Sequence, residues 1–575
     1  MSALKNNFSL AFLIGLIAAL IFIPFIGACP LFDWDEVNFA ECAREMLVTA
    51  NNRTVQLNYQ PFWEKPPLFI WLQAFCMNIF GVNEFAARLP NAVCGIASCV
   101  SMFYAGLHFH SRRFGITWCL IYAASLLPHF YFKSGIIDPW FNLFIFLSAF
   151  HAIRFLNNPS GKKEILNSIF SGLFLGLAVL TKGPAALVIM GLTLIFWMGW
   201  NKDFGVLRSK NFILFFITTI LISCSWFLLE WLSGNKKVVL EFIRYQIRLF
   251  NTGDSGHDGS FFYHFIVLLI GCFPTSILFL ISYFKYSQLS PYQRQFRKLF
   301  LCLFWVVLIL FSVVKTKIVH YSSLCYYPLT FMATIGVVNY FEDLKFNSVS
   351  RFLFILCSAL LSAVFLAMSL INVLKDGLIK SGLISDRFAI LSLQAHVHWS
   401  GFESLILIFM MGSCVLIYRA IKKHHYFMLY SGLSAQVIFI FLAILIYIPK
   451  VEQYTQHAAI EFYKANANSD CYIETHGFKS YAQLFYSNRK PGDYENKNQK
   501  EYIKNQLNVM EKEGHSRFSS YSTANLFWME VGDIDRPAYV VVKTPQEDEV
   551  NNRKEFQKLY EKNGYTFLVR LPKKK

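Results

Sequence analysis

Residues 427–448 read FMLYSGLSAQVIFIFLAILIYI and contain no charged side chain. A helix needs about 20 apolar residues to cross the hydrocarbon core of a bilayer, so this stretch predicts a membrane-spanning helix. Lys422 and Lys423 precede it, and Pro449 and Lys450 follow it. Beyond Lys450 the sequence becomes rich in charged residues. The stretch therefore marks the last membrane span and the start of a different kind of domain.

The chain after this span is predicted to form a soluble C-terminal domain of residues 450–575, following a membrane domain of residues 1–449. Helix-like residues, such as Gln499–Lys512, alternate in this tail with runs that have the apolar and β-branched character of strands. The strand-like runs are Cys471–Glu474, Tyr539–Lys543 and Thr566–Val569. This mixture predicts a small α/β domain.

Apolar blocks like the first recur upstream, and together they predict about thirteen spans. The blocks are 8–29, 88–108, 114–132, 139–156, 165–181, 184–200, 212–232, 262–283, 299–314, 320–341, 352–373, 402–420 and 427–448. The chain is 55% hydrophobic and only 15% charged, whereas a soluble protein of this length carries far more charge. We therefore expect an α-helical polytopic membrane protein.

Basic residues fill every second gap between the predicted spans, as at Arg112 and Arg113 or Lys422 and Lys423. Cytoplasmic loops of membrane proteins are enriched in Lys and Arg, so these gaps and the N-terminus are predicted to be cytoplasmic. The other gaps and the C-terminal domain would then face the periplasm of a bacterial inner membrane. Because these loops explain most of the net charge of +17, no nucleic-acid partner is expected.

Acidic residues stand out in the outward gaps. Asp35 and Glu36 begin a polar stretch in the long loop 30–87, and Asp138 precedes Pro139 in a short turn. A carboxylate in such a place can act as a general base, and all three are candidate catalytic residues. Asp35 and Asp138 could instead be helix caps, which is the commonest role of Asp at the start of a helix.

Lysines also occur on the outward side, where the positive-inside rule disfavours them. Lys65 lies between Trp63 and a Pro-led apolar stretch that is too short to span a membrane, and the short turns hold Lys182, Lys315 and Lys317. Such exceptions often mark function, here the binding of a lipid phosphate. The alternatives are an interfacial anchor at Lys65 and an inverted topology for the turns.

Metal binding is a further possibility. Glu64 and His257, the latter in the outward loop 233–261, could together hold a divalent cation such as Zn, Mg or Mn. A lone His in a polar loop is more often a surface residue than a ligand. The thirteen cysteines show no CxxC or Cys/His spacing, so they indicate neither a zinc site nor a disulfide framework.

These features together favour an enzyme that acts on a polyprenyl phosphate-linked sugar. Breaking the anomeric bond of such a donor needs cations to stabilise the leaving phosphate and a carboxylate to position or deprotonate the acceptor. A transporter or flippase of lipid-linked sugars is the alternative from another class. It would be expected to carry charges near mid-membrane in broken helices, and mid-span charges are few here.

At these residues the chain resembles the 4-amino-4-deoxy-L-arabinose transferase family, relatives of the protein O-mannosyltransferases. The resemblance lies in six segments spread over residues 30–330. They are Asp35-Glu36 through Glu45-Met46, Phe62-Trp63-Glu64-Lys65-Pro66, Ile137-Asp138-Pro139, Thr181-Lys182-Gly183, His257 with Phe261-Phe262-Tyr263, and Lys315-Thr316-Lys317 through Tyr321.

The resemblance implies a C-type membrane glycosyltransferase fold, an undecaprenyl phosphate-linked sugar donor, and lipid A or another envelope glycan or protein as acceptor. By position in these motifs, Asp35 and Asp138 would be the catalytic carboxylates. Lys65 would bind the lipid phosphate. The residues implied around that phosphate are Lys182, Lys315, Lys317 and Tyr321, and the implied metal pair is Glu64 with His257.

The chain departs from the family pattern at two places. Asn38 stands where the family has a basic residue, and Ile318-Val319 replaces the Leu-Pro of the family's turn. The identities of the donor sugar and of the acceptor therefore stay open, and protein O-mannosylation remains an alternative to the modification of lipid A.

Overall fold

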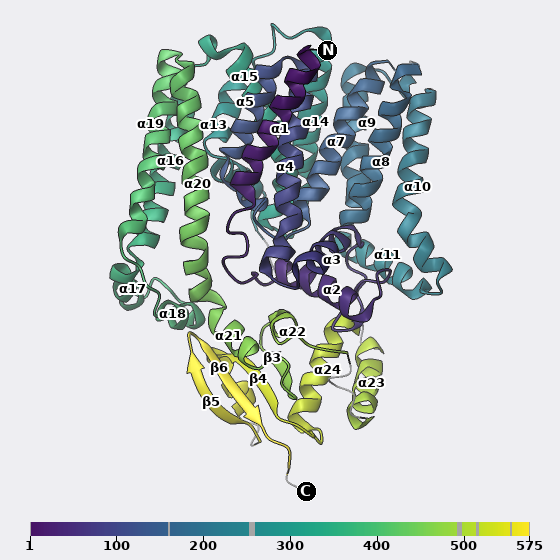
Figure 1. The fold of residues 1–575 in the computed structure, drawn as a ribbon, viewed down its shortest axis with the longest axis vertical. Coiled ribbons are helices and arrows are strands. Elements are labelled where there is room, and N and C mark those ends of the chain that lie inside the picture. Colours follow the sequence, from purple (N-terminus) through teal and green to yellow (C-terminus); the bar gives the residue numbers. More distant parts are fainter. Residues whose placement is uncertain are drawn as a thin grey trace.

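The computed structural model describes residues 2–158, 162–251, 259–491, 497–512, 517–551 and 555–573. It consists of a tall helical bundle, a layer of helices across one end of the bundle, and a small domain with a β-sheet beyond that layer (Figure 1). The N-terminus lies at the far end of the bundle from the sheet. The crossing layer, built largely from the loop after α1, is therefore enclosed between the bundle and the C-terminal domain.

The bundle contains most of the helices, a second group lies at its sheet-facing end, and the rest belong to the C-terminal domain. The bundle helices are α1 (Ser2–Phe22), α4 (Glu84–Phe109), α5 (Arg112–Ala123), α6 (Leu126–Tyr131), α7 (Asp138–Asn157), α8 (Ile165–Lys182), α9 (Ala185–Asn201), α10 (Lys210–Leu232), α12 (Tyr263–Gly271), α13 (Thr275–Ser282), α14 (Pro291–Val313), α15 (Tyr326–Asn339), α16 (Ser348–Ser369), α19 (Leu407–Lys423) and α20 (Tyr426–Thr455). The helices at the sheet-facing end are α2 (Asp35–Thr49), α3 (Leu68–Phe80), α11 (Lys236–Asn251), α17 (Ile371–Lys380) and α18 (Arg387–Leu393).

The protein is a multi-pass membrane protein, as its sequence predicts. Within the described residues, 8 helices are long and apolar enough to cross a membrane, or up to 9 if the bent pair α12–α13 is one span. Shorter apolar helices cover Asn6–Phe22, Leu68–Phe80 and Ala185–Asn201. The expected count of thirteen is therefore not confirmed.

Breaks inside predicted spans explain part of the difference in count. α12 and α13 meet at an angle of 108°. Pro274 precedes α13 and has no backbone N–H for a continuous helix, so the apolar run 262–283 breaks there. The run 320–341 likewise begins as a 3-10 helix, η3 (Val319–Cys325), before α15. Hydropathy detects apolar runs, but it does not detect such interruptions.

Small residues let the helices of the bundle approach one another closely. Gly172 and Gly176 lie on the face of α8 that packs against α10. A Cβ atom at Gly172 would lie 2.5 Å from the carbonyl oxygen of Phe215, and one at Gly176 would lie 2.5 Å from the Cβ of Ile222. Glycines four residues apart are a common contact surface between membrane helices, where there is no hydrophobic drive to associate.

The C-terminal domain is built on a four-stranded sheet in the order β3-β4-β6-β5, with β3 and β4 parallel and the other pairs antiparallel. The strands are β3 (Tyr472–His476), β4 (Ala538–Lys543), β5 (Gln557–Lys562) and β6 (Tyr565–Arg570). The helices of this domain are α21 (His457–Ala465), α22 (Ala482–Tyr486), α23 (Lys497–Lys512), α24 (Arg517–Val531) and α25 (Asp548–Asn551). The sequence does not predict β5, because this edge strand is exposed along its whole length.

An apolar core joins the helical layer to the C-terminal domain. Leu31, Met46 of α2 and Ile70 of α3 share this core with Phe462 of α21 and Phe485 of α22. A small hairpin of β1 (Gln56–Leu57) and β2 (Gln60–Pro61) lies between α2 and α3. Through the buried Leu31, the loop that leads into α2 thus packs against the C-terminal domain.

Candidate active site

A cavity of about 1020 Å³ lies where the helical layer, the bundle and the C-terminal domain meet. Its polar lining comes from segments far apart in the sequence: the loop before α2, the turn before α7, the end of α8, η3 and the C-terminal domain. The lining includes Asp33, Trp34, Asp35, Glu36, Asn38, Glu64, Lys65, Arg88, Lys133, Asp138, Lys182, Tyr245, Lys317, His320, Tyr321 and Lys479. Most of the candidate residues from the sequence therefore meet in one place.

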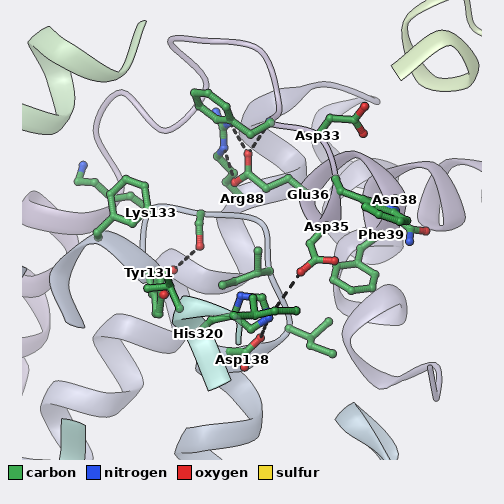
Figure 2. A pocket seen from close by; sticks show the side chains of 18 of the residues that line it. Asp33, Asp35, Glu36, Asn38, Phe39, Arg88, Tyr131, Lys133, Asp138 and His320 are labelled. Carbon is green, nitrogen blue, oxygen red and sulfur yellow. Dashed lines mark hydrogen bonds and ion pairs between the residues drawn. The ribbon is translucent and has the colours of Figure 1, made fainter. Parts of the chain in front are cut away.

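Asp35 and Asp138 approach the same imidazole ring. The Nε2 atom of His320 lies 3.7 Å from Oδ2 of Asp35 and 3.9 Å from Oδ2 of Asp138 (Figure 2). The Asp138 side chain is 4% exposed and that of Asp35 is 42% exposed. Asp35 is thus the carboxylate that a substrate in the cavity can reach more easily.

Neither aspartate acts as a helix cap in the described structure. The N-cap positions are Trp34 for α2 and Ile137 for α7, and no side-chain cap bond is made from either position. Each aspartate is the first residue of its helix. Negative charge in the first turn of a helix is still favourable, because the helix dipole is positive there. Capping does not explain why these two residues are acidic.

Lys182 completes the group around Asp138. Its Nζ atom donates a hydrogen bond of 2.6 Å to Oδ1 of Asp138 and lies 5.2 Å from the centroid of the Tyr321 ring. The side chain of Lys182 is 16% exposed. The pair therefore keeps an ammonium group next to a buried carboxylate at the edge of the cavity.

Lys65 extends the basic lining toward α11. Its Nζ atom lies 5.9 Å from the centroid of the Tyr245 ring, and the Tyr245 hydroxyl donates a bond of 3.3 Å to Glu64. Burial lowers the pKa of the Lys65 ammonium, although the nearby Glu64 carboxylate opposes this shift. A cation that is partly stripped of water attracts a phosphate strongly, because the surrounding medium screens it less.

Glu36 is tied to the bundle and does not reach toward His320. Its carboxylate accepts bonds from Nη2 of Arg88 at 2.7 Å, from the Phe32 N–H at 2.9 Å and from the Gly135 N–H at 2.5 Å. Burial alone would raise the pKa of Glu36, but the Arg88 guanidinium outweighs it and holds the pKa below its ordinary value. Glu36 therefore joins α2 to the turn that carries Asp138.

The two lysines of the turn after α14 differ in their surroundings. The Lys317 ammonium donates to the carbonyl oxygens of Phe311 at 3.1 Å, Ser312 at 2.7 Å and Val314 at 2.6 Å. It thereby caps the C-terminal end of α14, where carbonyls lack helical partners. Lys315 is exposed and lies outside the described lining of the cavity.

The structure describes only one residue of the predicted metal pair. Glu64 lines the cavity, whereas His257 lies outside the described residues. Within the described ranges, no group of three or more His, Cys, Asp and Glu side chains could hold a metal ion. The metal therefore stays a prediction, and no step below depends on it.

His320 and Arg88 are the main residues of this site that sequence reasoning did not select. Arg88 lies inside a predicted span, where its charge is itself a signal of function or of a buried ion pair. His320 stands next to Tyr321, which was selected, but a single His carries no pattern of its own. The place of His320 in the site becomes apparent only from the structure, in which η3 brings its ring close to Asp35 and Asp138.

Comparisons with known proteins give matches in sequence and in fold. A family model described as dolichyl-phosphate-mannose-protein mannosyltransferase matches residues 64–229, which include Lys65, Asp138 and Lys182. An undecaprenyl phosphate-alpha-4-amino-4-deoxy-L-arabinose arabinosyl transferase of Shewanella sediminis is 26% identical over 357 residues, covering 60% of this chain and 63% of the relative. The chain is related to the aminoarabinose transferases. The corresponding enzyme of Photorhabdus laumondii is 27% identical and covers 57% of this chain and 59% of its own.

The match to these aminoarabinose transferases spans less than two thirds of the relatives' own length. The fold, in contrast, agrees along almost the whole chain. The crystal structure of ArnT from Cupriavidus metallidurans bound to undecaprenyl phosphate covers 98% of this chain with a TM-score of 0.69 at 14% identity. The apo structure of the same protein has a TM-score of 0.70 and covers 99% of this chain. The protein therefore has the fold of a C-type membrane glycosyltransferase.

Proposed function

We propose that this protein is a glycosyltransferase that moves a sugar from an undecaprenyl phosphate-linked donor to lipid A or another envelope acceptor. One observation carries the proposal: two carboxylates that share one imidazole lie in the same cavity as two ammonium groups. These are Asp35 and Asp138 around His320, with Lys65 and Lys182 beside them. Negative groups that can activate an acceptor thus lie within reach of positive groups that can hold a phosphate.

The proposed reaction is a displacement at the anomeric carbon of the donor sugar. The acceptor oxygen forms a bond to this carbon as the bond from the carbon to the phosphate oxygen breaks, and the electron pair leaves with undecaprenyl phosphate. Lys65 and Lys182 stabilise the negative charge that develops on the leaving phosphate. Where the acceptor is a hydroxyl group, Asp35 takes its proton, because Asp35 is the more exposed carboxylate.

Asp138 and Glu36 have supporting roles in this proposal. Asp138 is buried and paired with Lys182, so it orients the ammonium group and His320. Glu36 fixes α2 to the turn before Asp138 through Arg88 and the Gly135 N–H. The two helices that carry the aspartates are thereby held in register with each other.

A protein acceptor is the second candidate within the same reaction class. The match of residues 64–229 to the protein mannosyltransferase family model favours it. The names of the curated relatives favour a lipid-linked aminoarabinose donor instead. The same experiment separates the two acceptors.

The experiment compares lipid A and glycoproteins by mass spectrometry from three strains. One strain has the protein, one lacks it, and one carries Asp35→Asn at equal expression. We expect a sugar-sized mass increment on lipid A that is present only in the first strain. An increment on proteins alone would assign a protein acceptor, and identical masses in all three strains for both classes would contradict the transferase function.

We also propose the orientation that the basic loops indicate. The N-terminus would be cytoplasmic, and the cavity and the C-terminal domain would be periplasmic at the inner membrane. The N-terminus and the C-terminal domain lie at opposite ends of the bundle, which is compatible with this orientation. The proposed metal at Glu64 and His257 can be tested by chelation, followed by activity after addition of Zn, Mg or Mn.

A further inference from the structure

The loop that leads into Asp35 is held from two sides. On the bundle side, Nη1 of Arg88 donates to the carbonyl oxygens of Ile26 at 2.8 Å and Cys29 at 2.9 Å, and its Nη2 donates to that of Pro30 at 2.9 Å. Arg88 also binds Glu36, the residue after Asp35. The bundle therefore fixes the loop before Leu31 and fixes α2 after Asp35, but Arg88 makes none of these bonds to residues 31–34.

Those intervening residues are held by the C-terminal part of the chain. The Gln456 side chain donates from Nε2 to the Leu31 carbonyl at 2.6 Å and accepts at Oε1 from the Asp33 N–H at 3.0 Å. The Leu31 N–H donates to the Tyr486 hydroxyl at 2.7 Å, and Lys479 lies 4.3 Å from the centroid of the Trp34 ring. The residues just before Asp35 thus contact a region more than 400 residues away in the sequence.

The bonds of Gln456 have the pattern of a strand pairing. A primary amide presents one donor and one acceptor in a plane, as a backbone peptide group does, and here it pairs with the main chain on both sides of Phe32. Gln456 itself lies at the junction between α20 and α21. The two bonds of Gln456 thus form a clamp that connects the loop to the end of a membrane-spanning helix.

We propose that Gln456 is a positioning residue for Asp35, and that the C-terminal domain thereby takes part in setting the geometry of the reaction. The role rests on the proposed transferase function. Asp35 is two residues after the clamped Asp33 N–H and one residue before the Arg88-bound Glu36. Without Gln456 the main chain at Leu31 and Asp33 loses two of the hydrogen bonds that hold it, and displacements of about 1 Å can reduce turnover roughly a hundredfold.

The first test measures the clamp and needs no activity. Hydrogen exchange of the peptide that covers residues 30–34 is compared in the full-length protein, in Gln456→Leu, and in the matched control Gln453→Leu at the end of the same helix. We expect exchange about tenfold faster in Gln456→Leu and unchanged in the control. Unchanged exchange in Gln456→Leu would overturn the clamp. Gln456→Glu, which keeps the acceptor oxygen and loses the donor, replaces Gln456→Leu if that variant does not fold.

The second test asks whether Gln456 acts through Asp35. Turnover is measured for Gln456→Leu, Asp35→Asn and the double variant, with the donor KM recorded for each. We expect Gln456→Leu to reduce kcat about tenfold or more, to leave the donor KM within about twofold, and to cause little further loss in the Asp35→Asn background. Losses that multiply in the double variant would overturn the positioning role. Absence of transfer by the unchanged protein would instead contradict the proposed function, while the exchange measurement would still decide the clamp.

Discussion

Asp35 and Asp138 allow a clear separation of chemistry from helix stability. Asparagine has the shape of aspartate without its charge, and neither aspartate makes a side-chain cap bond that the change could disturb. We expect Asp→Asn at either position to lower turnover by about a hundredfold, the scale of a lost general base. The free energy of unfolding should change by less than about 1 kcal/mol in Asp35→Asn. Asp138→Asn should cost more stability, because it leaves the Lys182 ammonium without its buried partner. Asp386→Ala is the matched control, because Asp386 does cap α18 by accepting from the Phe388 N–H.

That control should lose stability and keep full turnover, when both are measured on purified protein. Full turnover in Asp35→Asn and Asp138→Asn would remove both carboxylates from the proposed chemistry. Asp33, Glu36 and Glu64 would then be the carboxylates of the cavity lining left to examine.

Lys65 gives the site a predicted dependence on pH. Burial lowers the pKa of its ammonium group, so Lys65 loses its proton at a lower pH than an exposed lysine does. Since only the protonated form can hold a phosphate, activity should fall on the alkaline side below the pH at which ordinary lysines titrate. A pH–rate profile measures this limb, and Lys65→Arg should move it to higher pH because arginine keeps its charge. An alkaline limb that is identical in the arginine variant would mean that another group titrates.

His320 shows why a site of this kind is only partly predictable from sequence. Acidic and basic residues in outward gaps stand out against the composition of a membrane protein, and most of those selected in this way line one cavity. The imidazole between the two aspartates has no comparable signal, because its role depends on where η3 lies. We expect His320→Gln to lower turnover at least about tenfold while donor affinity changes little, since the two carboxylates lose their shared neighbour. Unchanged turnover would contradict a role for the ring.

Among the elements, the end of α14 shows that a candidate lysine can also have a structural role. Lys317 was expected to bind phosphate, yet its ammonium group is engaged with three carbonyl oxygens of that helix end. We expect Lys317→Ala to lower the free energy of unfolding by about 1–3 kcal/mol, the scale of lost hydrogen bonds to a charged group. Thermal unfolding in detergent measures it, with exposed Lys315→Ala as a control that should stay within about 0.5 kcal/mol. Equal stability of the two variants would contradict the capping role.

The sequence predicts where the helices lie, but it does not predict where they are interrupted. Each long apolar run of the sequence contains a helix, because lipid requires every backbone group to be satisfied within its own segment. Runs such as 262–283 and 320–341 are broken. Cys272 and Phe273 at the first break are buried within the protein, where other segments can satisfy the freed backbone groups. Composition does not distinguish such broken runs from straight spans, and the expected count of thirteen is therefore not confirmed.

At the scale of the whole molecule, the cavity is lined by residues of the membrane bundle, of the helical layer and of the C-terminal domain. Figure 1 shows this layer between the bundle and the domain. The sequence predicts both parts, since apolar blocks end where the charged tail begins. It does not predict that the tail packs on the loop before Asp35, because contacts such as Gln456 with Leu31 leave no local pattern. In a variant without the thirteen native cysteines, single cysteines at Lys5 and at Lys573 should be labelled from opposite sides of the membrane. Labelling of both from one side would contradict the proposed orientation.

The most direct test of the proposed function follows release of the carrier lipid by purified protein in lipid nanodiscs. The donor is an undecaprenyl phosphate sugar with a labelled lipid, lipid A is the acceptor, and free undecaprenyl phosphate and glycosylated lipid A are measured together. We predict that both products appear in equal amounts with the unchanged protein, and that Lys65→Ala, at unchanged folding, forms at least a hundredfold less of each. Equal product formation by Lys65→Ala would contradict the proposed function. It would also be contradicted if the unchanged protein formed no product with aminoarabinose, hexose or pentose donors and with either lipid A or protein acceptors.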